Sequence, residues 1–290
     1  MCGLRAALVG VGLLVLACPA LADELRPSGK LLLTGGVSDI EGAGGGGLAT
    51  WATITGYETR DGVGANVHGT LVSLPDYQFT AWGAAVGFRD RVEASYTRQA
   101  FNTEDVGAKL GIGKDFTFHQ DVLGLKLRVA GDAVYGQNSW MPQIAVGAQY
   151  KKADRGALVK ALGAKDDHGV DWYVAATKVL LGQSLVLDGT VRATRANQTG
   201  LLGFGGPKNG SYQAQFEGSA ALLLTRRLAV GVEYRSKPDN LGLKEDDWMD
   251  AFAAYAFNKS LSVTAGYADL GKIATFGGQR GLYLSLQAGF

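Results

Sequence analysis

The chain has 290 residues, and its 28 basic and 27 acidic side chains leave a formal net charge of +1. This balance offers no electrostatic reason to expect a nucleic acid as a partner, and we expect none. The two cysteines, Cys2 and Cys18, lie within the first 22 residues, which excludes a disulfide framework, a thiol nucleophile and a cysteine-based metal site from the rest of the chain.

The first 22 residues are typical of a secretory signal peptide. Arg5 supplies a basic start, residues 6–17 form an apolar stretch too short to span a bilayer, and residues 20–22 (Ala-Leu-Ala) match a cleavage site. A lipoprotein signal at Cys18 is the alternative, but the residues around this cysteine fit it poorly. We expect export through the inner membrane by this cleaved signal peptide, and a formally neutral mature chain, residues 23–290, that forms a single barrel unit.

After this leader the chain contains no run of 18 apolar residues, which excludes a membrane protein built from spanning helices. Segments of about ten residues with alternating apolar and polar side chains recur instead. Leu125 and Leu127 share one face of such a strand, whereas Lys126 and Arg128 share the other. The sequence predicts about fourteen strands, or twelve if 29–37 or another weak segment is misread: 29–37, 47–57, 62–72, 77–88, 91–101, 122–135, 142–151, 169–180, 184–195, 212–224, 228–236, 248–257, 260–270 and 281–290.

The lengths of the expected connections alternate along the chain. Those after even-numbered strands, such as 89–90 and 258–259, are short, whereas those after odd-numbered strands, such as 152–168, are long, with 73–76 as the exception. A transmembrane β-barrel has short periplasmic turns and longer external loops, whereas a soluble β-sandwich has no reason to sort its connections in this way. The pattern therefore predicts an all-β protein, a transmembrane antiparallel β-barrel in the outer membrane of a Gram-negative bacterium.

The last ten residues continue the alternation to the end of the chain. Leu282, Leu284 and Leu286 share one face, and the chain stops on Phe290. A strand with an apolar outer face and a terminal aromatic residue resembles the closing strand of outer-membrane barrels, with Tyr283 and Phe290 as its assembly signal. The resemblance implies the barrel-assembly machinery, outer-membrane lipid and lipopolysaccharide as partners.

Several longer stretches resemble one known family. They are residues 233–241 (EYRSKPDNL), 245–248 (EDDW), 267–271 (YADLG), 281–285 (GLYLS), 29–36 (GKLLLTGG) and 201–206 (LLGFGG). Together they are similar to a proteobacterial family of unknown function whose members are thought to be outer-membrane proteins. The resemblance covers almost the whole mature chain and implies no catalytic or binding residues.

No motif in the sequence indicates a cofactor, a metal site or a catalytic group. Residues 42–47 (GAGGGG) satisfy the dinucleotide-binding pattern G-x-G-x-x-G, but no helix is expected after them, so the geometry that cradles a phosphate is missing. His68, His119 and His168 lack the spacing of metal ligands, and none is paired with a serine on one strand face. We expect no enzyme activity, with an outer-membrane lipid hydrolase as the residual alternative.

Charged side chains recur on the polar face of the expected strands. On the lipid side, each Arg or Lys would cost about 2–4 kcal/mol at the bilayer midplane, so these side chains should point into the lumen. There they either line a water-filled pore and bias which solutes pass, or pair across the lumen and help to close it. The expected lumen-lining residues are Glu93, Lys126, Arg128, Asp132, Asp188, Arg192, Glu217, Glu233 and Arg235.

The longest expected loop, 102–121, is a candidate constriction. Its first residues are typical of a helix start in which Thr103 caps the helix, and residues 155–165 predict a second short helix. General porins fold a loop into the pore at the corresponding place. By that analogy the residues that would stand in the pore are Asp105, Lys109, Lys114 and Asp115.

We therefore expect a porin-like barrel for passive or weakly selective passage of small solutes. The mixed signs of the inward charges argue against a strong preference for anions or cations. The alternatives are a non-conducting structural or surface-interaction barrel, a lipid hydrolase, and uptake of apolar molecules through a lateral opening between strands.

Overall fold

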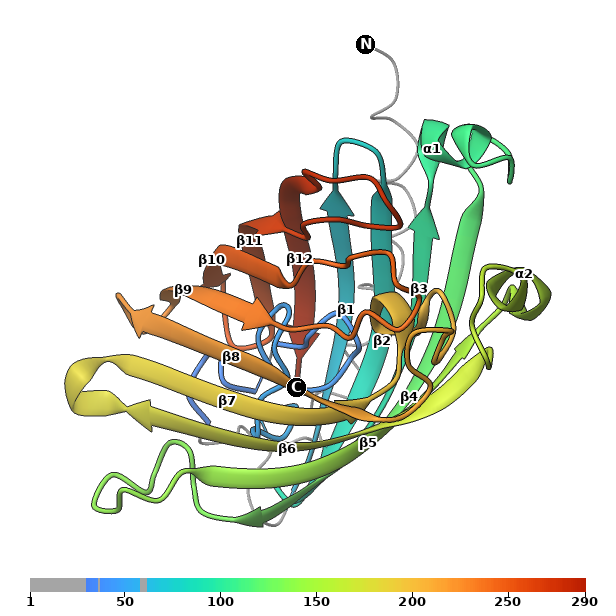
Figure 1. Cartoon of the computed structure of the whole chain (residues 1–290). Helices are drawn as coiled ribbons and strands as arrows, with labels where there is room; N and C mark the ends of the chain where they lie inside the picture. The colour runs from blue at the N-terminus through green and yellow to red at the C-terminus, as the bar shows by residue number, and fades with distance from the viewer. Residues whose placement is uncertain (1–29, 36, 58–61) are drawn as a thin grey trace.

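The computed structural model describes residues 30–35, 37–57 and 62–290. Within these residues, twelve antiparallel strands form a closed barrel in which neighbours in sequence are neighbours in the wall (Figure 1). The expected leader, residues 1–22, lies outside the described residues. The strands are β1 (Val63–Ser73), β2 (Gln78–Phe88), β3 (Val92–Asn102), β4 (Thr117–Ala130), β5 (Gln143–Ala153), β6 (His168–Leu180), β7 (Leu185–Thr194), β8 (Gln213–Leu223), β9 (Leu228–Arg235), β10 (Trp248–Ala256), β11 (Leu261–Asp269) and β12 (Arg280–Gly289).

Strands β1 and β12 close the barrel in antiparallel register. Leu71 is opposite Leu284, and Asn66 is opposite Gly289. The end of the chain extends this pairing, because the Phe290 N–H donates to the Ala65 carbonyl at 2.8 Å. Closure leaves the wall without an unpaired edge, which a sheet in a bilayer requires because lipid offers no hydrogen-bond partners.

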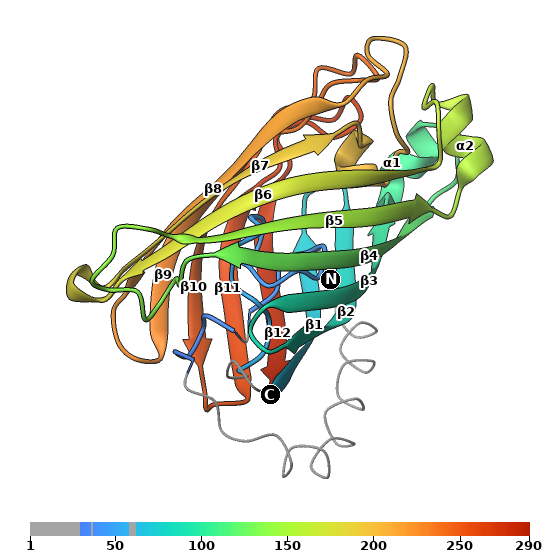
Figure 2. The ribbon, with the colours of Figure 1, turned by 90° about the horizontal axis from the view of Figure 1, so that it is seen from below.

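The strand count confirms the alternative of twelve and corrects the figure of fourteen. Each expected segment from 62–72 onwards becomes a strand of the wall, whereas no strand of the described chain arises from 29–37 or 47–57. Figures 1 and 2 show the described part of these segments, coloured blue, inside the barrel. We call residues 37–57 the plug; residues 37–56 are all buried.

The glycine run at 42–47 explains why the plug does not form membrane-length strands. Gly42 has a φ of +91°, a conformation that glycine adopts without steric cost. The backbone folds back on itself in isolated bridges that pair Ser38 with Gly44 and Gly45 with Thr50. Such tight reversals leave no extended stretch long enough to pair along a neighbouring wall strand.

Strand β4 ends earlier than the sequence pattern predicts. It runs over Thr117–Ala130 rather than 122–135. Gly131 has a φ of +70°, and the Asp132 carboxylate accepts hydrogen bonds from the N–H groups of Val134 and Tyr135. This turn ends the strand although the apolar alternation continues to Tyr135, and it places Asp132 in a turn rather than on a strand face.

The outward face of the barrel is apolar. Trp82, Leu125 and Phe216 are 56%, 58% and 58% exposed on three different strands. Soluble proteins rarely expose large apolar side chains on one strand after another, whereas a barrel in a bilayer presents such a band to lipid. The period of two therefore sorts apolar side chains to the outside and polar ones to the inside.

Most connections differ in length between the two ends of the barrel, as the sequence predicts. The turns after β2, β6, β8 and β10 are short and, together with the longer connection 131–142 after β4, define the turn end, which also holds the C-terminus; a 3-10 turn, η2 (Leu181–Gln183), lies there. The opposite end, the loop end, holds the long loops, with α1 (Glu104–Lys109), α2 (Gly156–Ala161) and η3 (Asn197–Gly200) (Figure 2). In the described chain, every helix is too short or too polar to cross a membrane.

The helix expected to start at 102–105 is present as α1, but its first turn is capped by a different residue from the one predicted. Thr103 does not cap α1, because its hydroxyl donates to the Phe116 carbonyl at 2.9 Å. The side-chain oxygen of Asn102 instead accepts the Glu104 N–H at 2.7 Å. This hydrogen bond between Thr103 and Phe116 joins the end of β3 to the start of β4, and α1 lies in the loop beyond it.

Candidate functional site

The candidate site is the interface between the plug and the polar inner face of the barrel. Glu233 on β9 accepts hydrogen bonds from the N–H groups of Gly47 at 2.8 Å and Leu48 at 2.5 Å, and Glu217 on β8 accepts the Thr50 N–H at 2.9 Å. Buried backbone N–H groups need partners. These wall carboxylates supply them and so hold the plug in a defined position.

The glycines of the plug are required by this contact. A Cβ atom at Gly46 would lie 1.7 Å from a carboxylate oxygen of Glu233, and one at Gly44 would lie 2.9 Å from a carboxylate oxygen of Glu93. The Gly44 N–H donates to Glu93 at 3.0 Å. Residues 42–47, which match a dinucleotide-binding pattern in sequence, therefore allow the plug backbone to approach the wall closely.

A buried charge network joins Glu41 of the plug to several wall strands. Its carboxylate contacts the Lys151 ammonium on β5, lies 2.8 Å from the Arg235 guanidinium on β9, and lies 3.6 Å from that of Arg192 on β7. Lys151 also lies 2.7 Å from the carboxylate of Asp171 on β6. Each of these side chains is at most 4% exposed. A single plug carboxylate thus bridges cations from strands that lie apart in the wall.

Arg192 forms the centre of this network. Its guanidinium donates to Glu217 at 2.5 Å, to the Gln149 side chain at 2.5 Å and to the Thr50 hydroxyl at 2.9 Å, and it stacks 5.1 Å from the ring centre of Tyr173. The contacts use the planar fork of the guanidinium in several directions at once. A lysine, which carries a compact ammonium, would not reproduce them.

A second buried cluster joins the plug to β3 and β4. The Lys126 ammonium lies 3.1 Å from the Glu93 carboxylate and donates to the carbonyls of Gly44 at 2.8 Å and Thr53 at 2.9 Å. Glu93 also accepts the Thr55 N–H at 2.7 Å. Both charged groups are therefore satisfied by the plug and by each other.

We expect these buried pairs to determine the position of the plug more than they add to stability. The desolvation of two charges offsets most of their attraction, whereas removing a single partner leaves an uncompensated charge and costs about 3–5 kcal/mol. The plug is therefore sensitive to any single break in the network, although the network as a whole contributes little net free energy.

The expected lumen-lining residues divide into two groups. Arg128 pairs with Asp90 and lies 3.0 Å from Asp132, near the turn end. Asp188 on β7 reaches the plug through Thr177, because it accepts a hydrogen bond from the Thr177 hydroxyl at 2.5 Å and that hydroxyl accepts the Ala52 N–H of the plug at 2.7 Å. The residues that contact the plug or its ion pairs directly are Glu93, Lys126, Arg192, Glu217, Glu233 and Arg235.

The loop between β3 and β4 does not carry its charges into the lumen, which corrects the expected constriction. Asp105 and Lys114 form an ion pair at 2.8 Å, with 74% and 64% of their side chains exposed. Val106 of the same loop is fully buried. Apolar side chains turn inward and charged ones outward because burying an unpaired charge is far more costly than leaving it in water. The four residues on the exposed side are Asp105, Lys109, Lys114 and Asp115.

The two residues of the expected assembly signal have different surroundings. Tyr283 is 2% exposed and faces the plug, where a Cβ atom at Gly47 would lie 3.2 Å from its ring. The Phe290 carbonyl accepts the N–H groups of Tyr57 at 2.9 Å and Ala65 at 3.2 Å. The last strand therefore contacts both the plug and the first strand of the wall.

Each of the three histidines has its own side-chain partner in the described part of the chain. Their side-chain partners are a threonine and two aspartates rather than a serine, and no group of three or more metal-ligating side chains occurs among the described residues. The pairs are His68 with Thr97 at 3.5 Å, His119 with Asp154 at 3.1 Å and His168 with Asp167 at 2.8 Å.

Sequence reasoning missed the plug residues that organise the site. Asp39 accepts the N–H groups of Glu41 at 2.8 Å and Ala43 at 3.1 Å and the Thr50 hydroxyl at 2.6 Å. The sequence did contain a signal that this segment is not a wall strand. Asp39 and Glu41 come just before a glycine-rich run, and acidic residues and glycines are both depleted in strands. Their acidic side chains match the cations that the polar strand faces carry inward.

A family model described as "Protein of unknown function (DUF3034)" matches residues 34–287. The chain therefore belongs to this family, and the resemblance seen in the sequence is confirmed. No curated protein matches the chain.

Solved structures of outer-membrane proteins share the barrel. The KdgM porin, in complex with disordered oligogalacturonate, has a TM-score of 0.50 and 8% identity over 78% of this chain and 99% of that chain. The NanC porin has a TM-score of 0.47 and 9% identity over 78% of this chain and 98% of its own. Outer membrane phospholipase A from Escherichia coli has a TM-score of 0.43 and 8% identity over 81% of this chain and 93% of its own. At these identities the likeness is one of fold alone.

Proposed function

We propose that this member of the DUF3034 family is a porin-like barrel of the outer membrane that passes small solutes when its plug moves aside. The observation that carries the proposal is the bridge from Glu41 of the plug to Lys151, Arg192 and Arg235 of the wall. The chain occupies its own lumen, and these charged contacts are part of what holds it there.

The way in which the plug is attached permits its release. Its contacts with the wall include hydrogen bonds and ion pairs that water entering the lumen can replace. Because desolvation offsets most of the attraction in buried pairs, the closed and open states differ in free energy by much less than the sum of the contacts. The wall groups left in the open lumen have mixed signs, which favours weak selectivity. They are Glu93, Asp171, Glu217 and Glu233, with Lys126, Lys151, Arg192 and Arg235.

A disulfide between plug and wall tests the proposal. The Ser38 hydroxyl in the plug donates to the side-chain oxygen of Asn66 on β1 at 3.1 Å. The expected mature chain has no cysteine, so Ser38→Cys combined with Asn66→Cys introduces a single reversible cross-link. In planar bilayers the wild type should show discrete openings, the oxidised variant should be silent, and a reductant should restore the openings.

A second cross-link is the matched control. The hydroxyls of Thr70 on β1 and Ser285 on β12 lie 2.8 Å apart within the wall. Thr70→Cys with Ser285→Cys therefore joins two wall strands without tying the plug, and its openings should persist after oxidation. Openings that also persist in the fully cross-linked Ser38→Cys/Asn66→Cys barrel would contradict control by the plug.

The non-conducting structural barrel is the second candidate, and one observation favours it. The complete burial of residues 37–56 leaves the plug in the lumen as a packed filling. A wild-type barrel that is folded, as judged by its heat-dependent mobility on a gel, yet silent at every voltage would support this candidate and overturn the first.

We further infer that export removes residues 1–22 and leaves 23–290 as one barrel unit. The apolar outer face supports contact with lipid and lipopolysaccharide, and the terminal strand ending at Phe290 supports insertion by the barrel-assembly machinery. Mass spectrometry of the protein from an outer-membrane fraction should find its N-terminus at Asp23. A lipid-modified Cys18 or an uncleaved leader would contradict this.

A further inference from the structure

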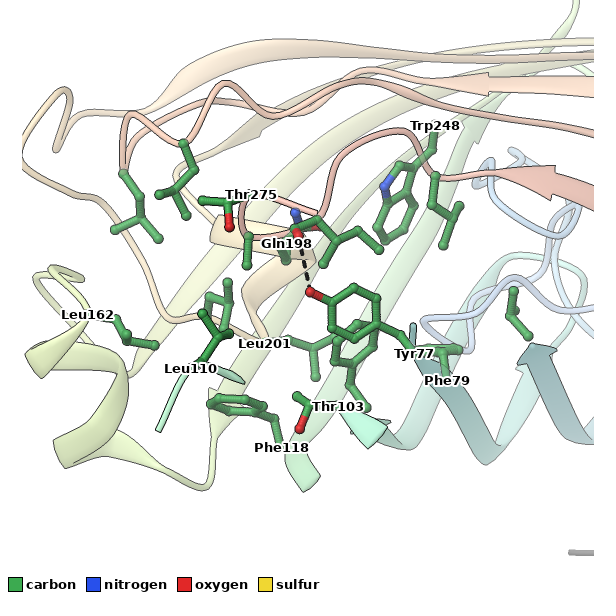
Figure 3. Close-up of a pocket in the computed structure, with 18 of the residues that line it drawn as sticks. Tyr77, Phe79, Thr103, Leu110, Phe118, Leu162, Gln198, Leu201, Trp248 and Thr275 are labelled. Atoms are coloured by element: carbon green, nitrogen blue, oxygen red, sulfur yellow. Dashed lines mark hydrogen bonds between the residues drawn. The ribbon is translucent and has the colours of Figure 1, made fainter. Parts of the chain in front are cut away.

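An apolar cavity of about 250 Å³ lies between the plug and the long loops. The plug contributes Ile40 and Leu48, and the loops contribute apolar side chains such as Leu110, Leu162 and Leu201. Figure 3 shows the lining side chains around a common space, with Leu110 and Leu162 toward one end and Tyr77 and Trp248 toward the other. The cavity thus joins segments that are far apart in the sequence.

The size of this cavity sets it apart from a packing defect. Protein interiors are close-packed, and few of their voids exceed a water molecule. A dry apolar cavity of about 150 Å³ holds one benzene, so by proportion about 250 Å³ accommodates a molecule of about ten heavy atoms.

The lining selects for a neutral, mostly apolar occupant. In the described chain, no residue that lines the cavity carries a charge at neutral pH, and burying an unpaired charge there would be costly. Two of the few polar groups already have partners. The Tyr77 hydroxyl donates to the Ile273 carbonyl at 3.2 Å, and the Thr103 hydroxyl donates to the Phe116 carbonyl.

Trp248 contributes a buried polar group to the lining that lacks such a partner. Its side chain is 4% exposed, and its indole Nε1–H has no hydrogen-bond partner among the described residues. The ring is held in place by the Lys237 ammonium, which lies 4.8 Å from its centre and donates to the Gln198 side chain at 3.2 Å. A buried, fixed and unpaired donor in an apolar wall is positioned to meet an acceptor on an occupant.

Three lining residues also have a positive φ. Gln198 has a φ of +46°, Ala274 a φ of +50° and Thr275 a φ of +99°. A β-branched residue such as Thr275 rarely adopts a positive φ, and strain of this kind persists only where the surrounding structure imposes it; ligand sites are among the places where it clusters. The loops around the cavity are therefore shaped at a local cost in conformational energy.

We propose that this cavity binds a small, neutral, mostly apolar molecule of about ten heavy atoms whose one hydrogen-bond acceptor meets Nε1–H of Trp248. Because Ile40 and Leu48 of the plug form part of its wall, the occupant touches the plug and belongs to the solute class that the barrel passes. This second step rests on the proposed function, whereas binding itself does not.

Binding is tested by calorimetry on the folded mature protein with 1-indanone and indane, which differ mainly in one carbonyl. The wild type should bind 1-indanone about three- to tenfold more tightly than indane, as one neutral hydrogen bond allows. Trp248→Phe should remove this preference while indane still binds. Equal affinities of the wild type for the two probes would overturn the assignment of Trp248.

Filling the cavity provides the second arm of the test. Ala268 on β11 lines the cavity and is fully buried, whereas Ala251 on β10 is exposed on the lipid side. Ala268→Phe should weaken binding of both probes at least tenfold. Leu201→Trp fills the same space from a loop and should have the same effect; it replaces the first variant if that one does not fold. Ala251→Phe should bind as the wild type does, which controls for uptake into detergent. Absence of binding to the wild type, or equal binding by filled and control variants, would overturn the site.

The link to the plug has its own readout. In planar bilayers, 1-indanone should change the opening frequency of the wild type but not that of Ala268→Phe. Binding without any change in opening would overturn the link to the plug while leaving both the cavity site and the proposed gating in place.

Discussion

Replacing Lys151 by methionine provides the sharpest test of how the plug is held. The Lys151 ammonium is fully buried between Glu41 of the plug and Asp171 of β6, from which it lies 2.7 Å. Methionine keeps an unbranched apolar stem but removes the charge. In the closed state both carboxylates lose a cation, whereas in the open state water surrounds them, so the substitution destabilises the closed state selectively.

The expected magnitude follows from the contacts that remain. Removing one partner of a buried pair costs about 3–5 kcal/mol. Arg235 still holds Glu41 at 2.8 Å, so the loss falls mainly on Asp171 and the lower figure applies. At about 1.4 kcal/mol for each factor of ten, the ratio of open to closed barrels should rise about 100-fold.

The assay is the open probability of single barrels in planar bilayers. Arg98→Met is the matched control, because Arg98 pairs with Asp121 at 2.9 Å at a partly exposed site and should change the open probability less than about twofold. Adding Asp171→Asn to Lys151→Met removes the uncompensated charge and should return the ratio toward that of the wild type. A folded Lys151→Met barrel with unchanged open probability would refute the reasoning.

Three further predictions follow from the same contacts. Gly46→Ala places a Cβ atom 1.7 Å from Glu233 and should raise the opening frequency about tenfold through overpacking, whereas Gly182→Ala, with no atom within 4 Å of its Cβ, should not. Arg192→Glu should shift the reversal potential of the open barrel in a salt gradient toward cation selectivity; an unchanged potential would remove Arg192 from the conducting lumen. Burial lowers the pKa of Lys237 to about 8 from 10.5, so between these values the unfolded state binds more protons and stability rises with pH. Relative to that of Lys237→Met, the free energy of unfolding of the wild type, measured in urea, should rise by up to about 3 kcal/mol between pH 8 and pH 10.5. A difference between the two proteins that does not change with pH would count against this pKa.

The wall of the barrel was readable from the sequence because each strand meets two different environments. Leu125 faces outward and Lys126 inward on the same strand, and this local alternation repeats from β1 to β12. Connection lengths were equally local and separated the turn end from the loop end, except for the short connection after β1 and the long one after β4. The error at β4 came from a turn centred on Gly131 and Asp132, whose chemistry overrode an alternation that continues beyond it.

The plug was the principal error, and its cause is not local. Segments 29–37 and 47–57 carry enough apolar residues to suggest strands, yet a wall strand needs a partner on each side, and β1 and β12 already complete the pairing. The excluded chain then fills the lumen, where Asp39 and Glu41 meet the cations of the inner face. The sequence showed that those cations point inward, but it did not show what they would bind.

By itself the sequence determined the fold class, the compartment it implies and the face of each strand that meets lipid, because these depend on residues close together in the chain and on the solvent at each face. Only the tertiary structure decided that the lumen is occupied, that Glu41 joins Lys151, Arg192 and Arg235, and that Leu48, Leu201 and Trp248 enclose a cavity. These features depend on contacts between plug and wall residues that are 38 to 194 positions apart in the chain, and the closure of the barrel determines which segments meet.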